Sequence, residues 1–230
     1  MAFTTPSFVW FFLLVALVHF ALPQRARWIW LLAASLFFYG YAEPSFLIQI
    51  LAATAVSFWL AQKIEAAPDK AAKQKLLWPG IALLAGNLVL FKYTPMFNET
   101  LRGLLGLAHV DYPIPELRWL LPLGISFYTF QLISYLVDVF RGQKAEGHFG
   151  LFALYVTFFP KLVAGPIERA KNLLPQLHAR PGFSYAQSLE AMQLIIWGVI
   201  QKAVIADRIA PFVNTVYDNP AGANGVQITL

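Results

Sequence analysis

The sequence predicts an all-α protein, a polytopic bundle of transmembrane helices, and three features of its composition carry that prediction. Hydrophobic residues make up 58% of the 230 residues and charged residues only 13%, whereas soluble domains are about half apolar and a quarter charged. The apolar residues gather in runs of helix length between short charged stretches. The chain also contains 20 Phe and 7 Trp, and aromatic residues form belts at membrane interfaces. We therefore expect residues 1–230 to form one transmembrane domain.

Six or seven apolar segments follow one another, and each is a candidate helix. In order they cover Phe3–Leu22, Trp28–Ala42, Pro44–Gln62, Leu76–Phe91, Trp119–Val137, Phe149–Pro160 and Ala191–Ala206. The first has no basic residue ahead of it, which favours a spanning helix over a signal peptide. The third and fifth each hold nineteen uncharged residues, close to the roughly 20 that span a membrane. A mixed stretch at 93–118 follows the fourth, and Lys202 interrupts the seventh.

The basic residues predict how these segments are oriented. With the N-terminus outside, the odd-numbered loops carry Arg25, Arg27, Lys63, Lys70, Lys73, Lys75, Arg141 and Lys144. The even-numbered loops carry only Lys92, Arg102 and Arg118. Lys and Arg concentrate in cytoplasmic loops, so we expect a multi-pass protein with an extracytoplasmic N-terminus. This pattern accounts for the net charge of +5 without a nucleic-acid partner, and the absence of Cys excludes disulfides and thiolate metal sites.

The sixth segment departs from this pattern in two ways. Its twelve residues would reach about 18 Å as a helix, whereas the hydrocarbon core is about 30 Å thick. Alternation would also place the basic stretch Lys161–Arg180 outside. One interpretation is a re-entrant or half-crossing element near 158–170, broken by Pro160, Gly165 and Pro166, with its backbone buried or lining a cavity. A short tilted helix with a basic outer loop explains the same residues equally well.

Polar residues form stripes on the fifth and seventh segments. At about 100° per residue, one face of the fifth carries Tyr128, Gln131, Ser134, Tyr135 and Asp138. One face of the seventh carries Glu190, Gln193, Trp197, Gln201 and Arg208. Polar groups at membrane depth are costly, so they face a bundle interior or a water-filled path. One hypothesis is a polar channel between the two helices, and the other is interhelical hydrogen bonding that holds the bundle together.

The residue types alone give no catalytic arrangement. His19 lies in the apolar first segment, and connecting regions hold His109, His148 and His178, without a partner that the sequence identifies. The chain has no Gly-x-Ser-x-Gly, no His-Glu-x-x-His and no Walker loop. No catalytic residue and no metal ligand is therefore assigned.

Several long motifs, taken together, resemble a known family. They are Leu121–Gln131 (LPLGISFYTFQ) continuing to Arg141-Gly142, Phe158–Arg169 (FFPKLVAGPIER) followed by Leu173–Gln176 (LLPQ), and Trp197-Gly198 with Ile205–Arg208 (IADR). The chain resembles the membrane-bound O-acyltransferase family, and within it the bacterial polysaccharide branch. The likeness runs along essentially the whole chain and corresponds to the N-terminal half of the family's usual length.

This resemblance implies a helix bundle around a tunnel, through which an acyl group reaches an extracytoplasmic hydroxyl. The expected donor is acetyl-CoA or a related acyl carrier, with no bound cofactor, and the expected acceptor is alginate or a similar exopolysaccharide. The expected partners are the lipid bilayer, the polysaccharide and periplasmic acetyltransferase proteins, at the bacterial inner membrane.

The catalytic His assigned to the family follows a Trp, and no His of this chain does. The resemblance therefore transfers no catalytic residue and implies that the base lies further along a longer parent. The tunnel or donor-site candidates are Lys161, Glu168, Arg169, Tyr128, Gln131, Asp138, Lys202 and Arg208. Lys161 and Arg169 are expected at the tunnel mouth, where cations attract donor phosphates or a uronate polymer. The alternatives are a transporter or polysaccharide-export component, and an inactive truncated product.

Overall fold

Every regular element in the described part of the chain is a helix, as the composition predicts. The computed structural model describes residues 5–107, 121–162, 165–179 and 182–218. Three helical stretches there are long and apolar enough to cross a membrane, and they are Pro44–Ala66, Lys70–Leu107 and Tyr185–Tyr217. The prediction of an all-α membrane bundle is confirmed.

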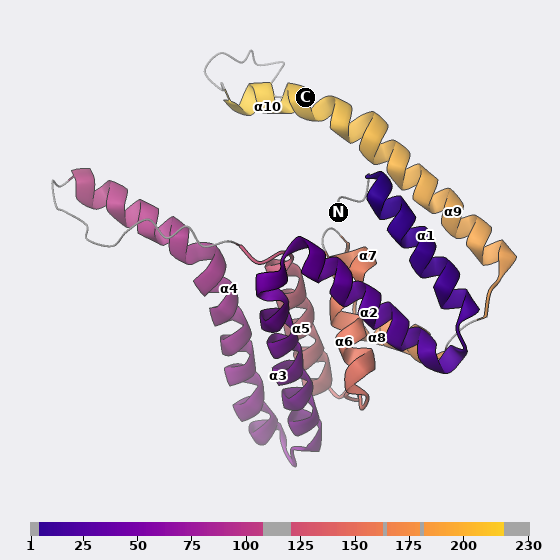
Figure 1. The fold of residues 1–230 in the computed structure, drawn as a ribbon. Helices are drawn as coiled ribbons and strands as arrows, with labels where there is room; N and C mark the ends of the chain where they lie inside the picture. Colours follow the sequence, from indigo (N-terminus) through magenta and orange to yellow (C-terminus); the bar gives the residue numbers. More distant parts are fainter. Residues whose placement is uncertain (1–4, 108–120, 163–164, 180–181, 219–230) are drawn as a thin grey trace. The chain divides into compact units, whose positions relative to one another are not determined.

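The chain divides into two units, and each is described by itself. The larger unit is essentially Val15–Pro181, and the smaller combines Ala2–Leu14 with Gly182–Leu230. Helix α1 (Pro6–Ala21) begins in the smaller unit and ends in the larger one. The other helices of the larger unit are α2 (Gln24–Ala42), η1 (Pro44–Phe46), α3 (Leu47–Ala66), α4 (Lys70–Leu107), α5 (Ile125–Phe140), α6 (Phe149–Thr157), α7 (Phe159–Leu162) and α8 (Ala170–Ala179) (Figure 1).

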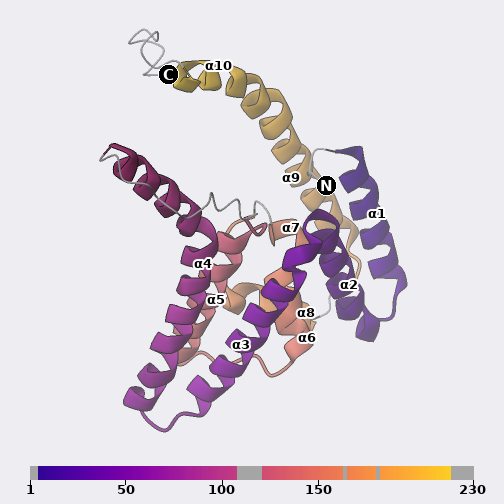
Figure 2. The same ribbon diagram turned by 60° about the vertical axis from the view of Figure 1, so that its left-hand side comes forward.

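Helices α3, α4 and α5 lie side by side in the larger unit (Figure 1, Figure 2). Helix α5 contacts both α3 and α4, and α6 packs against α2 and α3. Their shared interior is one cluster of buried apolar side chains, which includes Tyr39, Ile50, Leu84, Leu132 and Phe152. Burial of this surface away from lipid and water holds the helices in register, because each side chain has partners on neighbouring helices.

The connection between α3 and α4 is shorter than the gap at 63–75 between the third and fourth apolar segments. Only residues 67–69 separate the two helices. Asp69 Oδ1 accepts a hydrogen bond from the Ala72 N–H (2.6 Å), which satisfies one of the free N–H groups where α4 begins. Helix α4 then continues through Pro79 and Pro95 into the mixed stretch at 93–118, because helices at membrane depth tolerate proline where neighbouring groups satisfy the freed carbonyls. Residues 108–118 lie outside the described part of the chain.

The sixth segment forms two short helices instead of one. Helix α6 has nine residues and ends at Thr157, and α7 has four. All residues from 151 to 157 are buried, while Phe149 at the start of α6 is 44% exposed, so protein encloses α6 beyond its first turn. A short helix of this kind fits a half-crossing element better than a tilted spanning helix. Residues 163–164 of the predicted element lie outside the described residues.

After α7 the chain returns to the place where α6 began. Helix α8 lies beside α6 (Figure 2), and His178 near its end contacts Glu146, three residues before α6, at 2.8 Å between Nε2 and Oε2. The stretch from 149 to 178 therefore leaves and re-enters at one end of the larger unit. This geometry favours the re-entrant interpretation, while a half-crossing of the bilayer itself stays a prediction.

The same contacts gather basic residues at one end of the larger unit, here called the basic end. The ring of Trp28, near the start of α2, lies 4.8 Å from that of His148, and Gln62 of α3 donates to the Glu146 carbonyl (2.6 Å). The basic side chains at this end include Arg25, Arg27, Lys63, Lys70, Lys73, Lys75, Arg141, Lys144 and Lys171. Lys171, which strict alternation places outside, thus joins the group that the charge count assigns to the cytoplasm.

The smaller unit carries a long apolar stretch made of α9 (Tyr185–Ile200), η2 (Gln201–Ala206) and α10 (Asp207–Asp218). Ser184 caps α9 by accepting the Gln187 N–H (3.4 Å). The interruption predicted at Lys202 is a π-helical turn, η2, within an otherwise continuous helix. No described side chain of α9, η2 or α10 is buried, so this helix has an uncovered surface on every face.

Candidate functional site

The polar stripe of α5 faces the interior of the larger unit, as predicted. Tyr128, Gln131, Tyr135 and Asp138 each expose at most 7% of their surface. Leu132, on the opposite face of α5, is buried as well. Phe127 and Phe130 expose 41% and 51% of their surfaces on a third face of α5, but the buried polar groups of the stripe must find partners within the protein.

One line of contacts joins this stripe to the stretch from 149 to 178, which we call the returning segment. Gln131 Nε2 donates to the backbone carbonyl of Tyr155 on α6 (3.0 Å). The Tyr155 hydroxyl donates to the Glu168 carbonyl (2.9 Å), which holds the connection between α7 and α8 against α6. Lys161 Nζ lies 4.1 Å from the centroid of the same tyrosine ring, a cation–π contact. Tyr155 is buried and is not among the predicted site residues, but it contacts three residues that are: Gln131, Lys161 and Glu168.

Two charged groups in this region have unmet hydrogen-bonding capacity. Asp138 Oδ2 and Lys161 Nζ are buried and have no hydrogen-bond partner among the residues that the structure describes. A buried charge without a hydrogen bond is costly. A polar ligand or water would remove that cost, so these two atoms mark the interior near Tyr155 as a candidate binding region.

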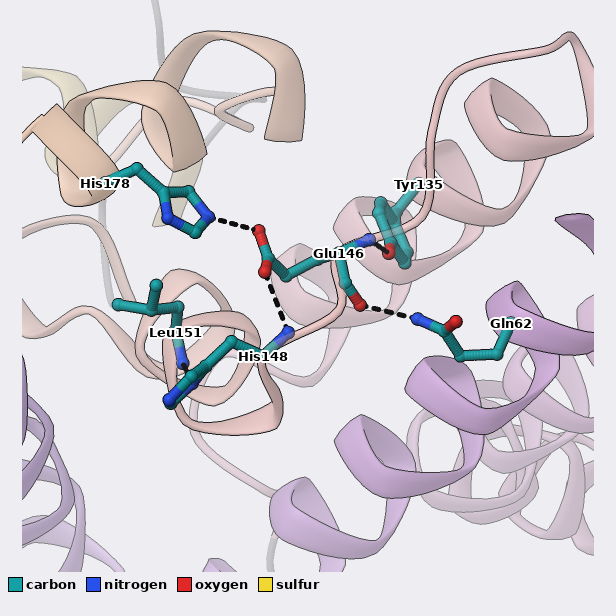
Figure 3. Close-up of polar contacts among 6 residues, drawn as sticks. All are labelled: Gln62, Tyr135, Glu146, His148, Leu151 and His178. Atoms are coloured by element: carbon teal, nitrogen blue, oxygen red, sulfur yellow. Dashed lines mark hydrogen bonds and ion pairs between the residues drawn. The ribbon is translucent and has the colours of Figure 1, made fainter.

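A second group of contacts converges on Glu146 at the basic end (Figure 3). Its backbone N–H donates to the Tyr135 hydroxyl (2.8 Å), and its carbonyl accepts from Gln62 Nε2 (2.6 Å). Its carboxylate accepts the His148 N–H (2.8 Å) and contacts His178 Nε2 (2.8 Å). Residues from α3, α5, α8 and the loop before α6 are therefore tied together through one glutamate.

The sequence analysis did not find this group. Glu146 is the one acid in the basic stretch 141–148, and that contrast was the available signal. His148 has a structural role, because its Nδ1 accepts the Leu151 N–H (3.2 Å) and caps α6. The pairing with His178 joins residues 32 positions apart, a separation that no local spacing predicts.

A cavity of about 460 Å³ lies between the loop at 143–147 and α8, and we call it the α5–α8 pocket. Its volume is typical of small-molecule sites, about 300–1,000 Å³. Besides Tyr135, its charged or titratable lining residues are Lys144, Glu146, Lys171 and His178. The lysines favour an anionic ligand. An imidazole with one nitrogen held by a carboxylate can exchange a proton through the other.

The remaining predicted site residues lie apart from these two groups. Arg169 is exposed just before α8. Lys202 and Arg208 belong to the smaller unit and are exposed, with Lys202 Nζ 2.5 Å from Asp207 Oδ1. The path expected between the fifth and seventh segments stays a prediction, because those helices belong to different units. Among the described residues, no three His, Cys, Asp or Glu side chains are grouped closely enough to hold a metal ion.

Comparison with known proteins confirms the resemblance predicted from the motifs. The chain is 34% identical to the alginate O-acetylase AlgI of Azotobacter vinelandii, over 92% of the chain and 42% of that relative. It is 33% identical to AlgI of Pseudomonas aeruginosa, over 91% and 41%. It is 29% identical to the peptidoglycan O-acetyltransferase of Helicobacter pylori, over 98% and 48%. No family model and no solved structure matches the chain.

The names of these relatives fit the resemblance to membrane-bound O-acyltransferases, and the match covers part of each relative's length. Nearly all of the chain aligns, yet it spans less than half the length of each of these curated relatives.

Proposed function

We propose that this chain is part of an O-acetyltransferase that transfers acetyl groups from a cytoplasmic donor to an extracytoplasmic polysaccharide. The observation that carries the proposal is the similarity, over nearly the whole chain, to relatives named for O-acetylation of alginate and of peptidoglycan. Both names pair the same reaction with a polymeric acceptor. We take alginate or a similar exopolysaccharide as the acceptor and the bacterial inner membrane as the location.

The reaction requires a donor with an activated acyl group, for which we propose acetyl-CoA or a related acyl carrier. The acceptor oxygen bonds to the acyl carbon, the thioester carbon–sulfur bond breaks, and the hydroxyl proton is finally carried by the thiol. Such donors bear phosphates, and the α5–α8 pocket offers Lys144 and Lys171 to bind them. The general base of this reaction is not assigned to any residue of the chain.

We place the basic end in the cytoplasm, because Lys and Arg concentrate on that side of a membrane. The protein would then be multi-pass with an extracytoplasmic N-terminus. The acetyl group would leave at the opposite end of the bundle, where periplasmic acetyltransferase proteins are the proposed partners.

The acyl path is proposed to run past the enclosed polar residues of the larger unit. The α5 residues Tyr128, Gln131 and Asp138 would line it, together with Lys161, Glu168 and Arg169 of the returning segment. Lys202 and Arg208 are proposed donor-site residues of the smaller unit. Support comes from the buried atoms Asp138 Oδ2 and Lys161 Nζ, which have no partner among the described residues.

The test replaces Lys161 and Arg169 together by Gln in the complete protein. Transfer of labelled acetyl groups from acetyl-CoA to the polysaccharide is measured in membranes, with insertion followed by protease protection. Hydrogen bonds to charged groups contribute about 1.5–3 kcal/mol each, so transfer should fall at least about tenfold. The control, Arg25→Gln with Lys75→Gln, removes the same charge at the basic end and should retain transfer. Unchanged transfer in the double variant would remove these two residues from the acyl path.

A further inference from the structure

A second cavity at the basic end has a different lining and indicates a different ligand. It has a volume of about 490 Å³ and lies between the α3–α4 connection and the end of α5. We call it the α4–α5 pocket, and its lining residues are Pro68, Asp69, Lys70, Lys73, Phe140, Arg141 and Gly142. The positively charged side chains of the lining come from two parts of the fold. Lys70 and Lys73 lie in the first turn of α4, and Arg141 directly follows α5.

Within the described ranges, no acidic side chain pairs with the cations of this pocket. Lys70, Lys73 and Arg141 form no ion pair with any residue that the structure describes. The single carboxylate of the lining, Asp69, is turned to the start of α4, where it accepts the Ala72 N–H (2.6 Å). A guanidinium presents paired donors that match phosphate oxygens, and ammonium groups add charge. The lining is therefore suited to a phosphate group.

The turn at the end of α5 keeps this pocket open. Gly142 has φ of 105°, in the region that glycine adopts without strain. A Cβ at this position would meet no atom within 4 Å. The chain can thus turn sharply after Arg141 and leave the space beside it free for a ligand.

Two exposed tryptophans place the pocket relative to a membrane. Trp59 on α3 and Trp78 on α4 expose 56% and 62% of their surfaces, and Lys63 Nζ lies 5.7 Å from the Trp59 ring. Tryptophan on a spanning helix prefers the headgroup level. Lys73 of the pocket precedes Trp78 by five residues of α4, about 7.5 Å at 1.5 Å per residue, and the headgroup layer on each side of a membrane is about 5–8 Å thick. The pocket therefore lies on the water side of this aromatic belt, within reach of the lipid phosphates.

We propose that the α4–α5 pocket binds the phosphate headgroup of an anionic phospholipid. Basic pockets between membrane helices have the charge that such headgroups need. A soluble phosphate shares this chemistry, but Trp78 and Leu83 leave apolar surface exposed along α4, which acyl chains of a lipid would cover. The α5–α8 pocket differs from the α4–α5 pocket in its lining. There a carboxylate, that of Glu146, is paired with another lining residue, His178. This assignment does not depend on acetyl transfer.

The experiment compares two triple variants of the complete protein, purified in detergent and titrated with phosphatidylglycerol or phosphatidylcholine. Native mass spectrometry counts the bound lipids. Lys70→Gln with Lys73→Gln and Arg141→Gln should weaken phosphatidylglycerol binding on the order of 100-fold, at about fivefold per cation. The control variant, Arg25→Gln with Lys63→Gln and Lys75→Gln, removes equal charge at the same end outside the pocket. It should retain the tight phosphatidylglycerol site, and phosphatidylcholine should bind weakly throughout.

Equal loss in the two triple variants would overturn the proposal, because it would mean diffuse attraction to the whole basic end. Glycerol 1-phosphate is titrated in place of the lipid, and binding as tight as that of phosphatidylglycerol would show that the acyl chains contribute nothing, identify a soluble phosphate as the ligand and overturn the lipid assignment. Arg141→Gln alone, checked by gel filtration for folding, should weaken binding about fivefold. It decides the question if the triple variant does not fold, and unchanged binding would refute the pocket.

Discussion

Helix α5 of the larger unit and the α9–α10 stretch of the smaller unit carry similar sequence patterns with opposite outcomes. Both are apolar helices with a polar stripe along one face. The stripe of α5 is enclosed, and Gln131 donates to the Tyr155 carbonyl of α6. The stripe of α9–α10, from Glu190 to Arg208, is exposed throughout. A polar stripe therefore predicts that a helix will meet polar partners, but the partner must be supplied by another element.

The largest expected difference between the two units concerns packing. Phe152 is fully buried, and its ring contacts those of Phe58, Tyr135 and Tyr155. Phe152→Ala should lower the free energy of unfolding by about 3–5 kcal/mol, because it removes these contacts and leaves a cavity. Denaturant titration of the complete protein in mixed micelles measures this.

The matched control for that change is Phe212→Ala on α10, where the ring is 46% exposed. The same truncation there should cost less than about 1 kcal/mol. Equal losses at Phe152 and Phe212 would mean that the smaller unit is packed as densely as the larger one, and the comparison would fail.

A smaller effect is expected from the carboxylate that joins the loop before α6 to α8. Glu146→Ala removes the acceptor of the His148 N–H and the contact with His178. Both contacts are accessible to solvent, where a hydrogen bond contributes about 0.5–1.5 kcal/mol, so the free energy of unfolding should fall by about 1 kcal/mol and limited proteolysis should cut near α8 sooner. Glu190→Ala, at an exposed stripe position of α9, should change stability by less than about 0.5 kcal/mol. A Glu146 variant as stable as the Glu190 variant would contradict the role given to Glu146.

The smallest effect is expected at the ion pair between Lys202 and Asp207. Both side chains are exposed, by 60% and 46%, and pairs of this kind contribute about 0–1 kcal/mol. Lys202→Met should therefore leave the unfolding midpoint nearly unchanged, and any loss should disappear in high salt. A loss well above 1 kcal/mol that persists in salt would show that this pair is shielded from solvent in the complete protein. The stripe of α9–α10 would then resemble the enclosed stripe of α5 at this position.

Much of the fold could be predicted because its determinants are local. The uncharged run that forms α3 has the length and composition of a spanning helix, whatever surrounds it. The run predicted at 119–137 is shifted and shortened to the 16 residues of α5, which begins only after Gly124. The continuation of α4 through Pro95 was not predicted, because the local signals at Lys92 and Pro95 favour an end. Those signals are outweighed where neighbouring groups support a helix.

The candidate site was predictable only in part, for a related reason. Gln131, Lys161 and Glu168 were selected because polar residues in apolar segments are conspicuous. Tyr155, which they surround, lies in an apolar run and resembles a core residue. The contact between Glu146 and His178 depends on the return of the chain, and the excess of basic residues between 161 and 180 was its indirect signature.

That return also has a consequence for how such a protein can change over generations. The stretch from Glu146 to His178 starts and finishes at one end of the larger unit, so in the predicted re-entrant arrangement it would add residues without changing the parity of membrane crossings. Lengthening, shortening or rewriting it would leave every later helix on its original side. Packing still restricts its buried residues, such as Phe152, but changes in its length would not turn the rest of the molecule inside out.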